Sequence, residues 1–254
     1  MIELVNVCAG YGKETILHNI SCQFHTAGIT AIVGPNGSGK STLIKTILGI
    51  IPKSQGEIKI SGMDSTTMDR KELAREIGYL PQVRELPAIT AQRMILHGRF
   101  PHLSYPRVYS KADLKLVDDA MKQMGIESLR YKDVSKMSGG ERQKVYLAMA
   151  LVQNAKTIIL DEPTTYLDIA YQMELMNLLD NLKKEGKTIV VVLHDLNLAL
   201  QYADTIVVME KGMIQGIGTP NQIYNDKILE TVFQVQCKKL KDEEENEYYF
   251  FYKS

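Results

Sequence analysis

The glycine-rich stretch GPNGSGKST, residues 34–42, has residue types and spacing that suit phosphate binding. Its glycines allow backbone N–H groups to converge on an anion without clashes from side chains. The spacing predicts that Lys40 gives charge to the β- and γ-phosphates of a nucleotide, that Ser41 binds Mg²⁺ and that Thr42 reaches the α-phosphate. The expected nucleotide-binding residues are Gly34, Asn36, Gly37, Ser38, Gly39, Lys40, Ser41 and Thr42. An apolar segment precedes the stretch and an amphipathic one follows it, which disfavours a plain glycine-rich turn.

Two adjacent carboxylates, Asp161 and Glu162, follow the apolar run TIIL. Ligands of open parallel sheets gather at the carboxyl ends of strands, so the pair could face the phosphate site. Adjacent residues of an extended chain point in different directions, which predicts two roles. We expect Asp161 to hold Mg²⁺, through water, and Glu162 to polarise an attacking water. For an isolated Asp-Glu pair, a helix cap or a solvated loop would be the preferred interpretation.

Three other side chains could complete such a site. His194 ends the apolar run TIVVVL and could hydrogen-bond a γ-phosphate and orient water, although a lone histidine is more often structural. Gln82, after IGYLP, could contact Mg²⁺ or the water. Tyr11, in the turn AGYGK, could stack on a purine base or be an ordinary surface tyrosine.

A second anion-binding pattern occurs in KMSGGERQ, residues 136–143, where Ser138, Gly139 and Gly140 open a predicted helix. The first turn of a helix leaves N–H groups unpaired and carries partial positive charge. One chain therefore carries two candidate phosphate cradles.

The elements that must position these residues alternate between strand and helix. Strand-like segments occur at 2–7, 20–24, 30–34, 57–61, 77–82, 157–162, 188–195, 205–210 and 213–218. Helical periodicity between several of them predicts an α/β fold with helices on the faces of a parallel sheet. Residues 87–155 are mostly helical, which indicates a helical subdomain inserted in a core of 1–86 and 156–235. The end of the chain, 236–254, predicts a β-hairpin whose acidic run KDEEENE forms a solvated turn.

Bulk properties exclude several classes of protein. The 254 residues include 30 Lys and Arg and 30 Asp and Glu, so there is no global basic field for nucleic acid. No apolar run approaches the length of a membrane span, and the start MIELVNV lacks the basic region of a signal peptide. We expect a cytoplasmic protein that could dock on a membrane protein.

Taken together, these motifs resemble the nucleotide-binding subunit of ATP-binding cassette (ABC) transporters. The resemblance covers essentially the whole chain and implies a P-loop NTPase fold: a RecA-like core, an antiparallel β subdomain and an inserted helical subdomain. It implies ATP and Mg²⁺ as ligands. It also implies a head-to-tail dimer, in which Ser138, Gly139 and Gly140 close on the γ-phosphate held by residues 34–42 of the second subunit. Asp168, in TTYLD, belongs to a loop that lines the same interface.

Two positions differ from the commonest LSGGQ pattern of this family. Met137 replaces leucine at similar volume. Glu141 replaces glutamine, keeps a hydrogen-bond acceptor and suits the helix dipole, so it remains a nucleotide-binding candidate.

The branch of the family is indicated by finer features. Exporters of this family usually carry membrane helices on the same chain, and its sugar importers usually carry a regulatory domain after the cassette. This sequence shows no apolar run of that length and only a short segment after LHDL, so the resemblance implies an importer subunit at the cytoplasmic face of the membrane. Its expected partners are polytopic membrane permeases and an extracytoplasmic substrate-binding protein. ILHGRFPH, 95–102, and EPTTYLDIAYQ, 162–172, resemble subunits that import iron–siderophore complexes, haem or cobalamin. The resemblance also implies that residues 98–107 lie where this family docks its membrane partner, which favours a coupling role over a plain Pro-rich connector between helices. The alternatives are import of cobalamin, haem, molybdate or zinc, or a non-transport relative such as an iron–sulfur assembly subunit.

Overall fold

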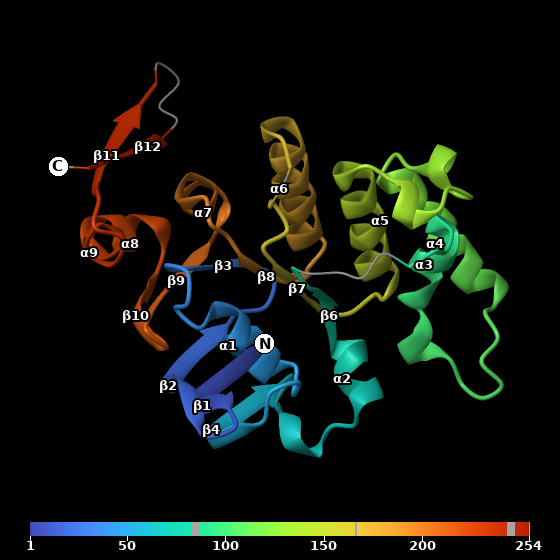
Figure 1. Cartoon of the computed structure of the whole chain (residues 1–254), viewed down its shortest axis with the longest axis horizontal. Coiled ribbons are helices and arrows are strands. Elements are labelled where there is room, and N and C mark those ends of the chain that lie inside the picture. The colour runs from blue at the N-terminus through green and yellow to red at the C-terminus, as the bar shows by residue number, and fades with distance from the viewer. Residues whose placement is uncertain (83–86, 166, 243–246, 254) are drawn as a thin grey trace. The chain divides into compact units, whose positions relative to one another are not determined.

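The computed structural model describes residues 1–82, 87–165, 167–242 and 247–253 (Figure 1). It divides into two compact units, Met1–Met68 with Met176–Ser254, and Asp69–Leu175. The first unit carries the phosphate loop, and the second carries the carboxylate pair and the second anion-binding pattern. The subdomain bounds expected from the sequence, 87 and 155, lie inside the second unit and remain a prediction.

The first unit contains two sheets and a hairpin. One sheet is antiparallel with the order β2-β1-β4-β5, and the other has the order β10-β9-β3-β8 within this unit. Strands β3 and β8 are buried along their whole length, as their continuous apolar sequences predict. The strands of this unit are β1 Ile2–Tyr11, β2 Glu14–Phe24, β3 Ile29–Val33, β4 Lys53–Ile60, β5 Met63–Asp64, β8 Thr188–Val192, β9 Thr205–Glu210, β10 Met213–Gly218, β11 Gln236–Lys241 and β12 Glu247–Tyr252.

Two helices of the first unit begin directly after predicted site residues. The helix α1 comes directly after the phosphate loop, and α7 comes directly after His194 and Asp195. The helices are α1 Lys40–Ile47, α7 Leu196–Tyr202, α8 Pro220–Asn225 and α9 Ile228–Phe233, and α6 Ile169–Lys184 begins in the second unit and ends in the first.

The second unit is mainly helical. Its strands β6 Ile77–Leu80 and β7 Thr157–Asp161 pair in parallel. Its helices are α2 Arg70–Glu76, α3 Ala91–His97, α4 Lys111–Gln123 and α5 Gly139–Val152. Each of these helices begins after a residue whose side chain accepts a backbone N–H, namely Asp69, Thr90, Ser110 and Ser138. Such caps explain why the helices begin at these positions.

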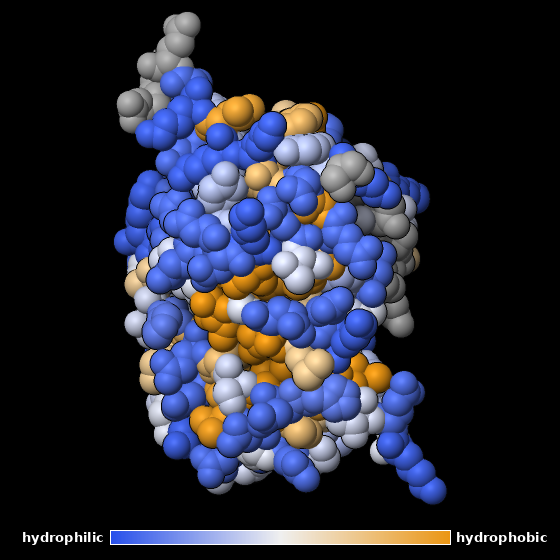
Figure 2. All heavy atoms as spheres, turned by 90° about the vertical axis from the view of Figure 1, so that its left-hand side faces the viewer, coloured by the Kyte–Doolittle hydropathy of each residue, from blue (hydrophilic) through white to orange (hydrophobic). Residues whose placement is uncertain are grey.

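The C-terminal hairpin pairs β11 with β12, and residues 243–246 between them, part of the expected acidic turn, lie outside the described residues. Figure 2 looks at the side of the molecule on which this hairpin and β10 lie, and hydrophobic side chains form a band there among hydrophilic ones. On β10, Met213 and Ile217 are exposed. Among the residues that the structure describes, no helix has both the length and the hydropathy needed to cross a membrane.

Candidate functional site

The phosphate loop joins the buried strand β3 to helix α1. A side chain at Gly34 would place its Cβ 2.2 Å from the carbonyl oxygen of Met209 and 2.7 Å from Oγ of Ser38, so only glycine fits. Gly37 and Gly39 have φ angles of 77° and 99°, in the left-handed region that glycine adopts without strain. The loop is therefore a tight turn whose backbone conformation depends on its glycines.

Two side chains make this loop suitable for an anion. Lys40 is 5% exposed, and its ammonium donates hydrogen bonds to the carbonyls of Gly34 at 2.8 Å and Pro35 at 3.0 Å. Its positive charge therefore lies inside the loop. Ser38 is 2% exposed, and among the described residues its buried hydroxyl has no hydrogen-bond partner. A buried hydroxyl without a partner costs free energy, so a phosphate oxygen would satisfy it. The loop fits a bound nucleotide.

His194 lies at the same sheet edge as the phosphate loop. Strand β8 is parallel to β3, with Val192 opposite Ile32, and the backbone N–H of Leu193 donates to Ile32 at 3.2 Å. Parallel neighbours end at one edge, so the structure brings the exposed His194 to the loop that follows β3. Tyr11 ends β1 in the antiparallel sheet, where it is 52% exposed.

In the second unit, Gln82 and Glu162 meet. Strands β6 and β7 are parallel, with Leu80 opposite Leu160, so both residues follow strand ends at one edge. The amide nitrogen of Gln82 donates to the carboxylate of Glu162. Glu162 has a φ of 53°, which turns the chain sharply as soon as the strand ends. Asp161, the last residue of β7, is only 2% exposed.

The donor atoms expected to hold Mg²⁺ are chemically suitable. They are the hydroxyl of Ser41, the amide oxygen of Gln82 and the carboxylate of Asp161, an oxygen-only set that Mg²⁺ prefers. The nitrogen of Gln82 is engaged with Glu162, which leaves its amide oxygen as the group for a cation. The set fits magnesium and would suit a thiol-seeking metal poorly.

The second anion-binding pattern forms the start of α5. The hydroxyl of Ser138 accepts the N–H of Glu141 at 3.2 Å, and the carboxylate of Glu141 accepts the N–H of Ser138 at 2.8 Å. The ammonium of Lys132 donates to both oxygens of this carboxylate, at 2.9 and 2.8 Å, and this bond is the main reason why the pKa of Glu141 is lowered. The glutamate is thus bonded within its own chain, and its predicted contact with nucleotide stays a prediction.

Gly139 and Gly140 have different surroundings. A Cβ at Gly139 would meet no atom within 4 Å, whereas one at Gly140 would lie 3.6 Å from the ring of Tyr171. Asp168 caps the helix that carries this tyrosine, because its carboxylate accepts the N–H of Tyr171 at 2.9 Å. The structure therefore places Gly140 beside the ring of Tyr171, whose backbone N–H is bound by Asp168. Tyr166, inside the TTYLD motif, lies outside the described residues.

Two supporting residues were missed from the sequence. Gln143 is 9% exposed, and its amide nitrogen donates to the carbonyl of Pro163 at 2.8 Å, which ties α5 to the segment after Glu162. Its place inside the quoted motif GERQ was the signal that could have found it. Lys132 precedes the motif and gave no such signal.

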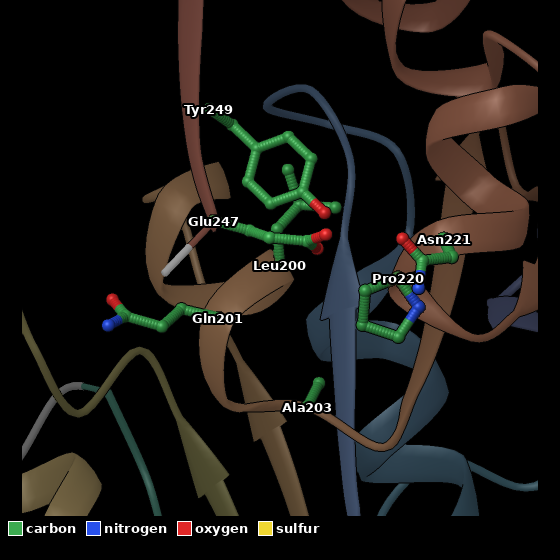
Figure 3. A pocket seen from close by; sticks show the side chains of 7 residues that line it. All are labelled: Leu200, Gln201, Ala203, Pro220, Asn221, Glu247 and Tyr249. Carbon is green, nitrogen blue, oxygen red and sulfur yellow. The ribbon is translucent and has the colours of Figure 1, made fainter. Parts of the chain in front are cut away.

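A pocket of about 330 Å³ opens between α7, α8 and β12 of the first unit (Figure 3). It is lined by Leu200, Gln201, Ala203, Pro220, Asn221, Glu247 and Tyr249. The carboxylate of Glu247 is paired with Lys239 at 2.5 Å. None of these lining residues is a predicted site residue, so this pocket is separate from the phosphate site.

Comparisons with known proteins show which proteins the chain resembles. Residues 17–165 match the family model described as ABC transporter. The ferric enterobactin transport ATP-binding protein of Escherichia coli is 38% identical over 235 residues, which cover 92% of this chain and 87% of the relative.

Solved structures of similar fold include a metal-chelate type ABC transporter in an inward-facing conformation. It is 25% identical, with a TM-score of 0.85 and coverage of 98% of this chain and 96% of the other. A dimeric bacterial ABC transporter cassette is 30% identical, with a TM-score of 0.77 and coverage of 87% and 99%. The predicted α/β fold of a P-loop ATPase is confirmed.

Proposed function

The chain belongs to the ABC transporter family, whose ATP-binding subunits hydrolyse ATP, and from that premise we propose that it powers import of an iron(III)–siderophore complex. The name of the enterobactin relative and the chelate-type structural neighbour support this cargo class. The stretches ILHGRFPH and EPTTYLDIAYQ point the same way.

Each residue of the site has its own role in hydrolysis. Lys40 and the loop N–H groups hold the phosphates, and the Ser38 hydroxyl donates to one of their oxygens. Glu162, held by Gln82, polarises the attacking water, while His194 orients that water and hydrogen-bonds the γ-phosphate. Asp161, Ser41 and Gln82 would hold magnesium, which would supply positive charge to neutralise the charge that develops on the phosphates. Tyr11 stacks on the adenine base.

The start of α5 serves a second copy of the chain. Ser138, Gly139, Gly140 and Glu141 close on the nucleotide bound by the partner copy, and Asp168 lines the same interface. Exposure of Ser138 and Gly139, with open space at Gly139, supports this role because another chain must reach them. Two such copies, head to tail, form two shared ATP sites.

Residues 100–108 are the proposed contact with a polytopic membrane permease. Phe100, Tyr105 and Val108 are 43%, 96% and 70% exposed, which is unusual for large apolar side chains so close in sequence. Docking there holds the chain at the cytoplasmic face of the membrane. An extracytoplasmic binding protein delivers the cargo to the permease.

The observation that best supports ATP binding is the phosphate loop with its buried Lys40 and the unpaired hydroxyl of Ser38. The proposed cargo is tested by a transport experiment. The chain should co-purify with a polytopic membrane protein. Proteoliposomes that contain this complex and its binding protein should take up radioactive iron as hydroxamate or catecholate complexes only when ATP is enclosed with the chain.

Other cargoes are separate arms of the same experiment. Uptake of cobalamin, haem, molybdate or zinc, with no uptake of ferric siderophore, would replace the proposed cargo. A chain that hydrolyses ATP but binds no membrane protein would support the non-transport alternative instead.

A further inference from the structure

The C-terminal end of α5 is held by residues 98–102. The amino group Nη1 of Arg99 donates to the carbonyl of Val152 at 2.8 Å, and Nε2 of His102 lies 2.8 Å from the carbonyl oxygen of Gln153. At Gly98, a Cβ would lie 2.1 Å from the carbonyl oxygen of Met149, so only glycine permits this approach. The last carbonyls of a helix lack partners within the helix, and basic side chains stabilise that end.

Arg99 is itself fixed from a second side. Its Nε donates to the carboxylate of Asp113 at 2.7 Å, and the two side chains are only 12% and 10% exposed. The carboxylate of Asp113 also accepts the N–H and the hydroxyl of Ser110, at 2.9 and 2.7 Å, at the start of α4. One planar guanidinium therefore joins the beginning of α4 to the end of α5, which a lysine ammonium cannot do with the same geometry.

Residues 100–108 lie between these two fixed points. They carry the exposed side chains of Phe100, Tyr105 and Val108, and the guanidinium of Arg107 lies 4.9 Å from the centre of the Phe100 ring. This exposed segment is therefore flanked in sequence by two anchored residues, Arg99 before it and Asp113 after it.

The opposite end of α5 carries Ser138, Gly139 and Gly140. The helix has 14 residues, which at 1.5 Å per residue is about 21 Å of rigid rod. We propose that Arg99 is a positioning residue that fixes segment 100–108 to the end of α5, so that permease docking sets the position of the Ser138–Gly140 cradle. This inference rests on the proposed function, because it requires a permease on residues 100–108.

The test compares two ATPase rates. In Arg99→Gln, the isolated subunit should hydrolyse ATP within about twofold of the wild-type rate, whereas stimulation by the permease and loaded binding protein should fall roughly tenfold, as for loss of a charge-assisted hydrogen bond. The variant should still co-purify with the permease. Arg99→Lys should recover part of the stimulation. Arg93→Gln, the same change at an exposed position of α3, should behave as wild type.

His102→Ala keeps the proposal testable if Arg99→Gln does not fold, since it removes only the contact with Gln153 and should also reduce stimulation. Basal and stimulated rates that fall in parallel would mean that Arg99 merely supports the fold. Stimulation at the wild-type level in both variants would also overturn the inference. If the wild-type chain itself is not stimulated by a permease, the proposed function fails, and this result is distinct from either outcome in the variants.

Discussion

The backbone N–H of Gly212 donates a hydrogen bond of 3.0 Å to the carbonyl oxygen of Ser38 in the phosphate loop. The carbonyl of Gly212 in turn accepts the N–H of His18 on β2, at 2.9 Å. The turn between β9 and β10 thus ties the phosphate loop to the antiparallel sheet. Gly212 contributes no side chain, yet its N–H fixes the backbone of Ser38, whose buried hydroxyl has no partner among the described residues.

Replacing Gly212 by alanine should weaken nucleotide binding. Lys211 and Gly212 have φ angles of 48° and 73°, as in a type I′ turn, and a Cβ at Gly212 would lie 1.7 Å from the carbonyl oxygen of Ile16. The turn between β9 and β10 must therefore shift, which disturbs the hydrogen bond from the N–H of Gly212 to the carbonyl of Ser38. We expect the Kd for ATP to rise about tenfold or more, measured by titration with a fluorescent analogue. The rate at saturating ATP should fall less than the affinity.

Gly62→Ala is the matched control for this change. Ser61 and Gly62 form the same kind of turn between β4 and β5, with φ angles of 51° and 84°. A Cβ at Gly62 would meet no atom within 4 Å, so this variant has the backbone strain without the clash. Equal loss of ATP affinity in both variants would show that the bond between Gly212 and Ser38 does not position the loop.

Glu162→Gln should retain ATP binding and lose turnover. The change removes the negative charge that polarises water but keeps a side chain of the same size beside Gln82. We expect the hydrolysis rate to fall by about 10²-fold or more, the usual contribution of a general base, and a dimer trapped with ATP to accumulate. Size-exclusion chromatography with ATP and a phosphate-release assay provide the two measurements. Normal turnover would remove Glu162 from its proposed role.

The local backbone structure around the motifs is what the sequence predicted best. The loop from Gly34 to Thr42 lies between a buried strand and a helix because those few residues determine its turn, and the chain order places His194 and Glu162 after apolar strands. Ser138, Gly139 and Gly140 were expected to open a helix, and α5 begins there, with a capping box between Ser138 and Glu141 that the structure adds.

Contacts between residues distant in sequence could not be predicted in the same way. Gly212 lies far along the chain from Ser38, and the need for glycine arises from the carbonyl of Ile16, which no local pattern reports. The stretch GRFPH was recognised as a family resemblance, but the contacts of Arg99 with Asp113 and Val152 depend on how three helices pack. Tertiary packing decides such contacts.

Ser138→Arg should abolish hydrolysis and leave ATP binding by the monomer near normal. Ser138 is exposed at the start of α5, so a large cation there fills the space that a second copy must enter. Binding to the isolated monomer is measured by nucleotide titration, and dimer formation by chromatography in the Glu162→Gln background. Ser138→Ala, which removes the cap without adding bulk, is the milder control. Persistent hydrolysis in Ser138→Arg would contradict the shared site.

Asp113→Asn should make the free energy of unfolding less sensitive to acid. Burial raises the pKa of Asp113, but hydrogen bonds from Ser110 and Arg99 outweigh this and lower the pKa from 3.8 to about 2. The unfolded chain therefore binds the proton more readily, and the stabilisation is present above pH 3.8 and lost as the pH falls towards 2. A shift of this size corresponds to about 2 kcal/mol of unfolding free energy.

The measurement is urea unfolding at pH 5.5 and at pH 3 (about 2.5 units apart, spanning the start of this window). The difference in unfolding free energy between the two pH values should be smaller in Asp113→Asn than in the wild type. Asp119→Asn, at an exposed position of the same helix, should show the same difference in unfolding free energy between the two pH values as the wild type. An equal difference in all three proteins would show that Asp113 is not the source of the stability lost in acid.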